Sequence, residues 1–467
     1  MPKTLLKKLL IALLYALPVV FLIVCYFCIT TTEEDILQGA GTTPAVWHDL
    51  IAAFNNNARL ADMYAWAVIN FFDYQYQFGV DTIFRLIDVV AAVGMLLLAC
   101  QVVLGRRPGL ALKDSLVWGG VFLIIFTTPF GYTFYRGFSM IHNYLIIVLA
   151  LLGFVLPFLQ KARGMEVSKL YRRWWFAVSM GLVFGLSANF PPPAFLATYL
   201  IVKIWQVYQL KRQKTTTKAL KPAAWEWWMI LAMLGSMAVG YLLGPGVSGY
   251  AADPVYTVSY DYVALGDIAQ NFGSSIVRIM RHMVINFGRT LSPAILIGLL
   301  LYGIALVRSR LSGSKLQFLP KEAPERKHLL VIGTFCIFVV LAGSQIVMPV
   351  RLCLPAYIGL TIIVMVLARG WFAGARVSGL LTGGVLISAA MLTLIVVRGY
   401  LALDFHARAG RSLDRIKDAQ TETVCIDINE SIQRFTTPFN IFQQEETFVP
   451  RRTTPITIYG KDVTHCN

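Results

Sequence analysis

Apolar residues recur along this chain in eleven long stretches, separated by polar segments that carry most of the charges. A helix that rises 1.5 Å per residue needs about 20 apolar residues to cross about 30 Å of hydrocarbon, and each stretch is close to that length. The pattern predicts membrane-spanning helices at 9–30, 81–104, 115–130, 140–159, 174–189, 194–208, 225–243, 290–307, 328–345, 348–367 and 377–398.

Composition supports the same fold class. The chain is 57% hydrophobic with a mean hydropathy of +0.63, which leaves too little polar sequence to coat a soluble globule of 467 residues. A net charge of +16 would suggest a nucleic-acid partner in a soluble protein. Here most of the excess lies in short loops that face lipid headgroups, so the expected partner is the bilayer and not nucleic acid.

The basic residues fall on alternate sides of the predicted spans. The segments on one side carry 24 lysines and arginines, whereas the opposite loops carry six outside the C-terminal tail. Because basic loops stay in the cytoplasm, this asymmetry predicts a multi-pass membrane protein. Its N-terminus is expected in the cytoplasm and its C-terminal tail on the opposite side of the membrane.

The first outer loop, residues 31–80, is the strongest functional candidate. It opens with TTTEED, which places Glu33, Glu34 and Asp35 immediately beyond the first helix, at the membrane surface. A carboxylate at that depth can act as a general base toward a substrate with a lipid tail and a polar head. Alternatively, the three acidic residues stabilise the N-terminus of the next helix.

Further along the same loop, apolar and aromatic residues recur at helical spacing and predict short amphipathic helices in the interface. Asn57 and Arg59 lie between them. A lone arginine in an acidic loop is either an ion-pair partner or an anion ligand, and the fork of its guanidinium suits phosphate.

Two other arginines lie at the ends of predicted spans. Arg289 closes the outer segment 244–289, and Arg351 stands at the outer end of the tenth span. An arginine near hydrocarbon is costly unless it is paired, which makes both candidates for binding an anionic headgroup. Snorkelling of the side chain to the interface is the alternative. Arg136 and His142 mark another outer loop, where the histidine is more typical of a hydrogen-bonded core residue.

The transmembrane domain is expected over residues 1–398, and a small periplasmic cap over 399–467. The cap begins with a predicted helix, FHARAGRSLDRIKDAQ, and continues with predicted strands in ETVCIDI and RTTPITIYG. Cys425 and Cys466 are the two cysteines of this exported tail, and in an oxidising compartment they are expected to form a disulfide. Two free thiols are the alternative.

Three segments resemble the GT-C superfamily of integral membrane glycosyltransferases, and in particular bacterial O-antigen-modifying, serotype-converting glucosyltransferases. They are NNNARLADMYAW in the first outer loop, RGFSMIHNYLIIVLALLGFVLPF with Asn143 and Tyr144, and VMPVRLCLP around Arg351. The resemblance implies an all-α polytopic fold with about 11 transmembrane helices, interfacial helices in the first outer loop and a small C-terminal α+β segment.

The resemblance also implies a reaction. A sugar would move from a polyprenyl-phosphate donor to a lipid-linked or cell-surface glycan, with one of the acidic trio as base and Arg59, Arg289 or Arg351 holding the phosphate. No cofactor is required, although clustered carboxylates can hold a divalent metal. A donor-synthesising transferase and a flippase of the same pathway are expected partners. An O-antigen polymerase or ligase and a transporter of lipid-linked sugars are the alternative functions.

Overall fold

The computed structural model describes residues 3–27, 78–127, 138–187, 190–212, 222–243, 263, 265–313, 316–348, 350–426, 432–435, 444–447, 456–458 and 461–465. Each of the eleven predicted stretches coincides with a helix. These helices are α1 (Lys3–Phe27), α5 (Phe78–Leu104), α6 (Leu112–Thr127), α7 (Phe138–Ala162), α8 (Trp174–Ser187), α9 (Pro191–Arg212), α10 (Ala224–Leu243), α14 (Phe272–Ser312), α15 (Ala323–Ala342), α16 (Leu354–Trp371) and α17 (Val377–Asp418).

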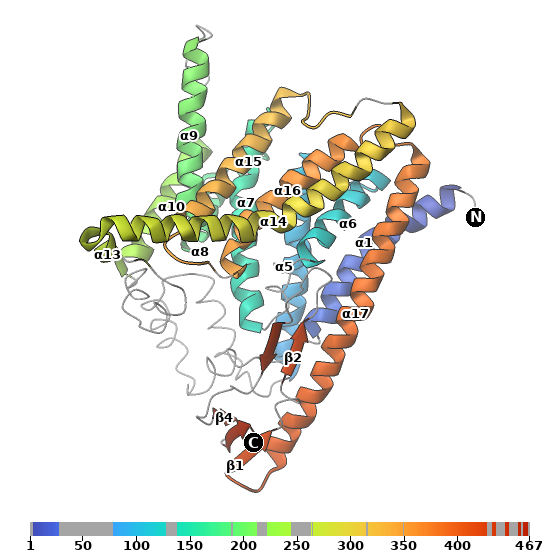
Figure 1. Ribbon diagram of the computed structural model, residues 1–467, viewed down its shortest axis with the longest axis vertical. Coiled ribbons are helices and arrows are strands. Elements are labelled where there is room, and N and C mark those ends of the chain that lie inside the picture. The colour runs from blue at the N-terminus through green and yellow to red at the C-terminus, as the bar shows by residue number, and fades with distance from the viewer. Residues whose placement is uncertain are drawn as a thin grey trace.

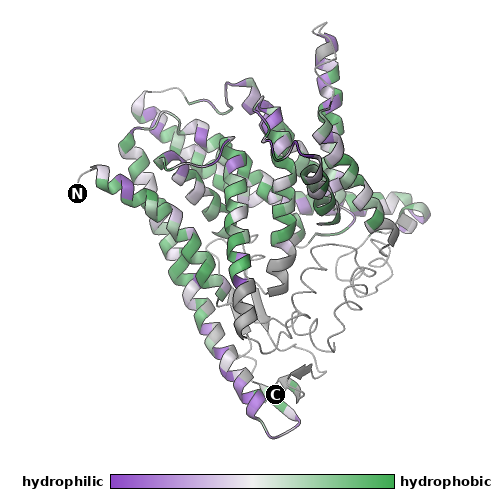
Figure 2. Ribbon diagram, turned by 180° about the vertical axis from the view of Figure 1, so that it is seen from behind, coloured by the Kyte–Doolittle hydropathy of each residue, from purple (hydrophilic) through white to green (hydrophobic). Residues whose placement is uncertain are grey.

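Six of the described helices are long and apolar enough to cross a membrane: α1, α5, α7, α14, α16 and α17. They share the apolar surface expected of a polytopic α-helical membrane protein, and polar residues gather where α17 and the loops leave the bundle (Figure 2). Burial separates the central helix from the peripheral ones. In α16 72% of the apolar window is buried, against 17% in α14, so α16 lies inside the bundle and α14 on its outside.

Helix α14 begins at Phe272, well before the expected start at residue 290. The added turns contain Arg278, His282, Asn286 and Arg289, which recur at three- and four-residue spacing along one side of the helix. A hydropathy profile ends at these polar residues although the helix continues. Part of the segment expected as an outer loop is therefore helix, and Figure 1 shows this first part of α14 running across the lower end of α15.

The three consecutive prolines 191–193 form the first turn of α9, before the start expected at residue 194. Proline lacks a backbone N–H, but the first N–H groups of a helix have no acceptor within the helix, and the fixed φ of proline suits this position. A proline run before an apolar stretch thus starts a helix here.

Helix α17 continues through residue 398 to Asp418, so the expected domain boundary falls inside one helix of 42 residues. The predicted tail helix is its last part, where Arg408 Nε donates to Asp404 Oδ2 at 3.0 Å. Strands follow in both predicted segments. β1 (Thr423–Ile426) pairs in parallel with β5 (Lys461–His465), which pairs antiparallel with β4 (Ile456–Ile458). A separate hairpin joins β2 (Ile432–Phe435) and β3 (Gln444–Thr447).

Helices α8 and α10 approach each other most closely at two glycines spaced four residues apart. A Cβ on Gly181 would lie 2.3 Å from the carbonyl oxygen of Met229, and one on Gly185 would lie 2.0 Å from Ser236 Oγ. Small residues at this spacing let two helix backbones pack in direct contact within a membrane. Glycine is therefore required here by space and not by backbone conformation.

One carboxylate joins four helices at the end of the bundle where α5 ends. Glu325, in the first turn of α15, accepts hydrogen bonds from Arg163 Nη2 at 3.0 Å and Arg369 Nη2 at 2.7 Å. The same arginines donate to the last carbonyl groups of α5: Arg163 to Val102 and Val103, and Arg369 to Val103 and Leu104. Both guanidinium groups therefore donate to carbonyls that lack an N–H partner within the helix.

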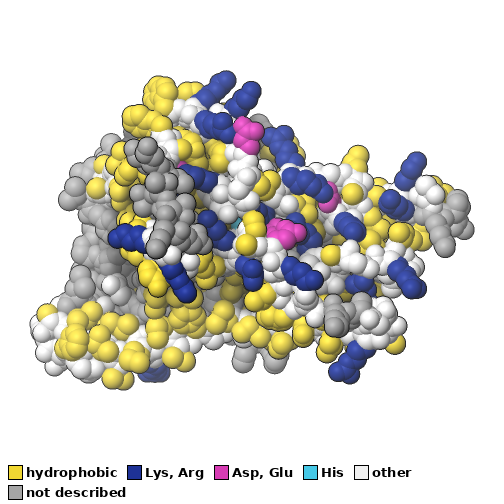
Figure 3. Space-filling view, turned by 90° about the horizontal axis from the view of Figure 1, so that it is seen from above, with side chains coloured by type: hydrophobic (Ala, Val, Ile, Leu, Met, Phe, Trp, Pro, Cys, Tyr) yellow, Lys and Arg dark blue, Asp and Glu magenta, His cyan; other side chains and the backbone are white. Residues whose placement is uncertain are grey.

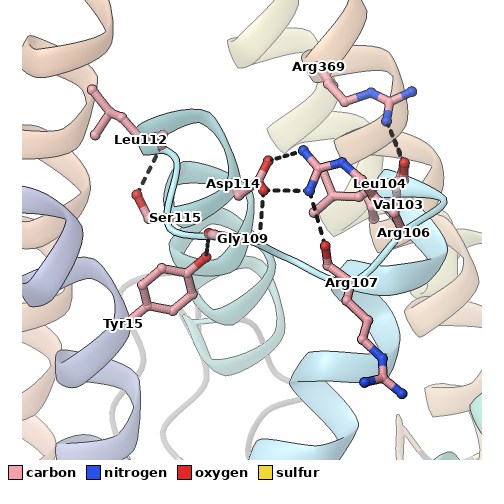
Figure 4. Close-up of polar contacts among 10 residues, drawn as sticks. All are labelled: Tyr15, Val103, Leu104, Arg106, Arg107, Gly109, Leu112, Asp114, Ser115 and Arg369. Atoms are coloured by element: carbon pink, nitrogen blue, oxygen red, sulfur yellow. Dashed lines mark hydrogen bonds and ion pairs between the residues drawn. The ribbon is translucent and has the colours of Figure 1, made fainter.

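The α5–α6 loop at this end is held by a second ion pair (Figure 4). Asp114 Oδ2 accepts from Arg106 Nη1 and from the Gly109 backbone N–H, each at 2.7 Å, while Oδ1 accepts from Arg106 Nη2 at 2.9 Å. Tyr15 of α1 donates to the Gly109 carbonyl at 2.6 Å. The hydrogen bonds and charge of Asp114 raise the pKa of Arg106 above its ordinary value. Asp114 thereby holds the loop to α6, and Tyr15 holds it to α1.

Replacing Gly181 with Ala should destabilise the protein by about 1 to 3 kcal/mol, because the added methyl overlaps the Met229 carbonyl. Gly235→Ala on α10 is the matched control, since a Cβ there meets nothing within 4 Å. The measurement is the thermal unfolding midpoint of each purified variant in detergent. Equal midpoints for both variants would contradict a glycine-dependent crossing.

Replacing Glu325 with Gln should cost on the order of 3 kcal/mol, because the enclosed guanidinium of Arg163 and the half-buried one of Arg369 lose their counter-charge. Glu166→Gln removes an exposed ion pair with Arg172 and should change stability by less than about 1 kcal/mol. Denaturation of both variants in the same detergent compares them. A Glu325 variant as stable as the Glu166 variant would show that the cluster does not hold the helices together.

Candidate functional site

The candidate site is built on a row of polar residues on α14. His282, Asn286 and Thr290 recur every four residues, which places them on one helix face, and all three are buried. Thr290 Oγ1 donates back to the Asn286 carbonyl at 2.7 Å. A buried polar row on an apolar helix needs partners outside the helix, because unpaired polar groups are costly in this environment.

Asn286 provides such contacts to the turn between α15 and α16, residues 343–353, which we call the α15–α16 turn. Its Nδ2 donates to the Ile346 carbonyl at 3.0 Å, and its Oδ1 accepts from the Met348 N–H at 2.9 Å. One amide thus satisfies a donor and an acceptor of the same loop. Val263 adds a third contact, because its N–H donates to the Gln345 carbonyl at 2.9 Å.

Gly343 lets this turn close tightly. A Cβ there would lie 2.2 Å from Met348 Sδ, because the fully buried Met348 side chain folds back across the glycine. The end of the turn is a 3-10 helix, η3 (Val350–Cys353), that leads directly into α16. The shape of the α15–α16 turn is therefore set by a missing side chain and by the Asn286 amide.

Arg289 lies against the same turn. Its Nη1 donates to the Met348 carbonyl at 3.1 Å, three residues before Arg351. The two arginines singled out from the sequence thus belong to neighbouring segments, α14 and η3. Arg289 is exposed, and the Met348 carbonyl is its one hydrogen-bond partner within the described residues. A guanidinium has five N–H donors, so most remain available to an anion.

A second group of charges lies near the opposite end of α5 from the Glu325 cluster. Arg85 Nη1 donates to the Tyr26 carbonyl in the last turn of α1 at 2.6 Å. Asp88, one turn further along α5, is 3% exposed, and Arg398 of α17 is 4% exposed. Charged side chains this deeply enclosed in apolar helices are costly, and they mark functional positions by default.

Sequence reasoning singled out none of Arg85, Asp88 and Arg398. All three lie inside apolar stretches, where a hydropathy profile averages them away. The usable signal was the presence of charges within predicted spans, near the end where the acidic trio follows α1.

The predicted site residues divide into three groups. Glu33, Glu34, Asp35, Asn57, Arg59 and Arg136 lie outside the described residues, as do the expected interfacial helices. The backbone of His142 and Asn143 is in the first turns of α7, and that of Arg351 is in η3. Tyr144 packs in the hydrophobic core at 6% exposure, as a structural side chain would.

Cys425 lies in β1 and is disulfide-bonded. Its partner lies outside the described residues, and pairing with Cys466 remains a prediction. The clustered carboxylates that could hold a divalent metal are those of the acidic trio, which is also outside this part of the chain. Within the described residues no three His, Cys, Asp or Glu side chains gather as metal ligands.

Replacing Asn286 with Ala should loosen the α15–α16 turn, because the Ile346 carbonyl and the Met348 N–H each lose a buried partner at about 1 to 3 kcal/mol. Cys353, fully buried in the native turn, reports on this change. A membrane-permeable maleimide should label Cys353 in the variant and leave it unlabelled in the wild type, as read by mass spectrometry of peptides. Asn271→Ala is the control, since Asn271 is exposed and makes no side-chain capping bond. Labelling that is equal in all three proteins would refute the role of Asn286.

Comparison of the chain with known protein families, with curated proteins and with solved structures finds no match. The chemistry available to the described residues lies in an exposed guanidinium beside the α15–α16 turn and in the buried charges of α5 and α17.

Proposed function

We propose that the protein is an integral membrane glycosyltransferase of the bacterial inner membrane. It moves a sugar from a polyprenyl-phosphate donor to a lipid-linked or cell-surface glycan of the O-antigen type, on the periplasmic side. The observation that carries the proposal is the pairing of Arg289 with the α15–α16 turn, which brings a guanidinium next to the segment that contains Arg351.

The distribution of charge supports the orientation. Lysines and arginines are spread over the end of the bundle that contains Arg106, Arg163 and Arg369, and few carboxylates accompany them (Figure 3). Such an excess is typical of the cytoplasmic face. The α15–α16 turn and the last turn of α1 lie at the other end, which makes that end periplasmic in the proposed orientation.

The arginines suit the leaving group of the reaction. A polyprenyl phosphate leaves with more negative charge than it carried as part of the donor, and its headgroup stays at the depth of the membrane boundary. Guanidinium groups placed there stabilise the charge that develops in the transition state. The Met348 carbonyl orients Arg289 while using only one of its donors.

The acidic trio supplies the base in this proposal. One of Glu33, Glu34 and Asp35 takes the proton of the acceptor hydroxyl, and the hydroxyl oxygen then bonds to the anomeric carbon. The bond from that carbon to the phosphate oxygen breaks, and its electrons leave with the polyprenyl phosphate. Support comes from the Arg85 contact to Tyr26, which fixes the end of α1 seven residues before Glu33.

An O-antigen polymerase or ligase is the second candidate. Such an enzyme is expected to rely on basic outer residues, and the buried Arg398 and exposed Arg289 favour it to that extent. The two functions differ in their dependence on an acidic base, which makes them separable by mutation.

Arg289→Lys should lower sugar transfer at least about tenfold, because lysine keeps the charge and loses the planar fork that contacts phosphate. Arg310→Lys, near the opposite end of α14, is the matched control and should leave transfer unchanged. The assay follows release of polyprenyl phosphate from a panel of polyprenyl-phosphate sugars by the full chain in nanodiscs, with lipid-linked glycan as acceptor.

Glu33→Gln, Glu34→Gln and Asp35→Asn, made singly, test the base in the same assay. Loss of transfer in one of them is expected. If all three retain activity while the Arg289 variant does not, the acidic base is refuted and the polymerase or ligase is favoured. Activity of every variant, including Arg289→Lys, would overturn the site itself.

A further inference from the structure

A cavity of about 640 Å³ lies between α7, α9, α15 and α16, separate from the α15–α16 turn and Arg289. Its size is within the roughly 300 to 1,000 Å³ usual for binding pockets of small molecules. Most of its wall is apolar and aromatic, with Phe158 of α7, Phe195 of α9 and Phe335 of α15 among the lining side chains. These walls suit a hydrocarbon chain.

The charged groups of the cavity gather at one end. Lys161 is in the last turn of α7, Lys327 near the start of α15 and Glu226 in the first turn of α10, while Lys203 lies along α9. The ends of α7, α10 and α15 that carry them lie on the basic face of the bundle. The cavity therefore has an amphipathic lining, apolar along its length and cationic at its mouth.

Glu226 is almost completely enclosed and fully engaged. It forms ion pairs with Lys161 and, at 3.7 Å, with Lys203, and it accepts from Tyr199 OH at 3.2 Å and from the Ala223 N–H at 3.1 Å. One carboxylate thus meets two ammonium groups. It balances one positive charge and has no oxygen left without a partner.

Lys327 adds a third ammonium group at the same mouth, and no described carboxylate pairs with it. Its positive charge lies close enough to repel the ammonium groups of both Lys161 and Lys203. Three lysines against one carboxylate leave a net charge of +2 beside apolar walls. Like charges this close are unfavourable unless an anion joins them.

We propose that this cavity binds a membrane lipid with an anionic phosphate headgroup. Its tail lies along the apolar wall of α7, α9 and α15, and its phosphate is held by Lys327, Lys203 and Lys161. A phosphate diester or monoester carries one or two negative charges, which matches the excess at the mouth. The charged end of the cavity lies at the basic face of the bundle, so the phosphate is expected at the level of the leaflet on that side. This proposal does not depend on the transferase activity.

The apolar walls favour an anionic lipid over a free phosphate ion as the occupant of this site. A free phosphate would use the lysines and leave the apolar walls empty, whereas a zwitterionic lipid would use the walls and bring no net charge. Only an anionic lipid satisfies both halves of the cavity. Snorkelling lysines on a basic membrane face attract anionic lipids without any cavity, and the experiment separates that case through Lys211, a lysine of α9 that does not line the cavity.

The test measures binding of defined lipids to the full chain in detergent by native mass spectrometry. Dioleoylphosphatidylglycerol and a C55 polyprenyl phosphate are the anionic probes, with dioleoylphosphatidylcholine and inorganic phosphate for comparison. Wild-type protein should bind one or both anionic lipids more tightly than phosphatidylcholine, and which of the two binds better identifies the tail. Equal binding of phosphatidylcholine, or binding of inorganic phosphate as tight as that of the lipids, would overturn the proposal.

Lys327→Gln should weaken the preferred anionic lipid about tenfold, as expected for one hydrogen bond to a charged group. It breaks no described ion pair, so the fold is retained. Lys211→Gln removes an equal charge from α9 outside the cavity and should leave binding unchanged. If both variants weaken binding equally, the lipid is held by general surface charge and the cavity site is refuted.

Val155→Phe tests the tail independently, because it narrows the apolar wall without changing any charge. Binding of both anionic lipids should fall severalfold, while Val396→Phe on the exposed side of α17 should have no effect. Unchanged lipid binding by Val155→Phe would show that the cavity does not hold the tail.

Discussion

The bundle depends on one requirement, that every charge and backbone polar group removed from water must find a partner inside the protein. Glu325 shows how this is met. Two arginines from different helices would be costly so close together, yet one carboxylate pairs with both, and their remaining N–H groups cap the carbonyl end of α5. The two arginines thereby connect the first turn of α15 to the last carbonyls of α5. This network of hydrogen bonds holds the ends of α5, α7, α15 and α16 together.

At the opposite end of the bundle, the backbone groups of the α15–α16 turn find their partners in neutral groups. Asn286 provides an amide where Glu325 provides a charge, and it holds the backbone of the α15–α16 turn by a donor and an acceptor at once. Because the turn is held by a neutral amide and not by a counter-charge, Arg289 beside it keeps an exposed positive charge. A rigid neutral support with an available cation is the arrangement that binding of a phosphate needs.

The two ends also divide the chemistry in the proposed functions. The basic face combines fixed ion pairs, such as Arg106 with Asp114, with one cavity mouth where lysines outnumber the carboxylate. The other end combines the arginine at the turn with the buried Asp88 of α5 and the buried Arg398 of α17. Phosphate lipids suit both faces, as a substrate at one and as a bound membrane lipid at the other.

The sequence by itself determined the helices, because apolar stretches of spanning length have no other stable form in a membrane. It also predicted strands in residues 422–428 and 452–460, where β1 and β4 lie, and it singled out Arg289 and Arg351. It failed where a helix carries polar residues past the apolar stretch, as in α14, and where prolines begin a helix, as in α9. Only the tertiary structure decided which charges meet. The partners of Glu325 lie 162 and 44 residues away in the chain, and the lysines of the cavity come from three helices. Hydropathy depends on neighbours along the chain, whereas ion pairs and cavities depend on which helices pack together.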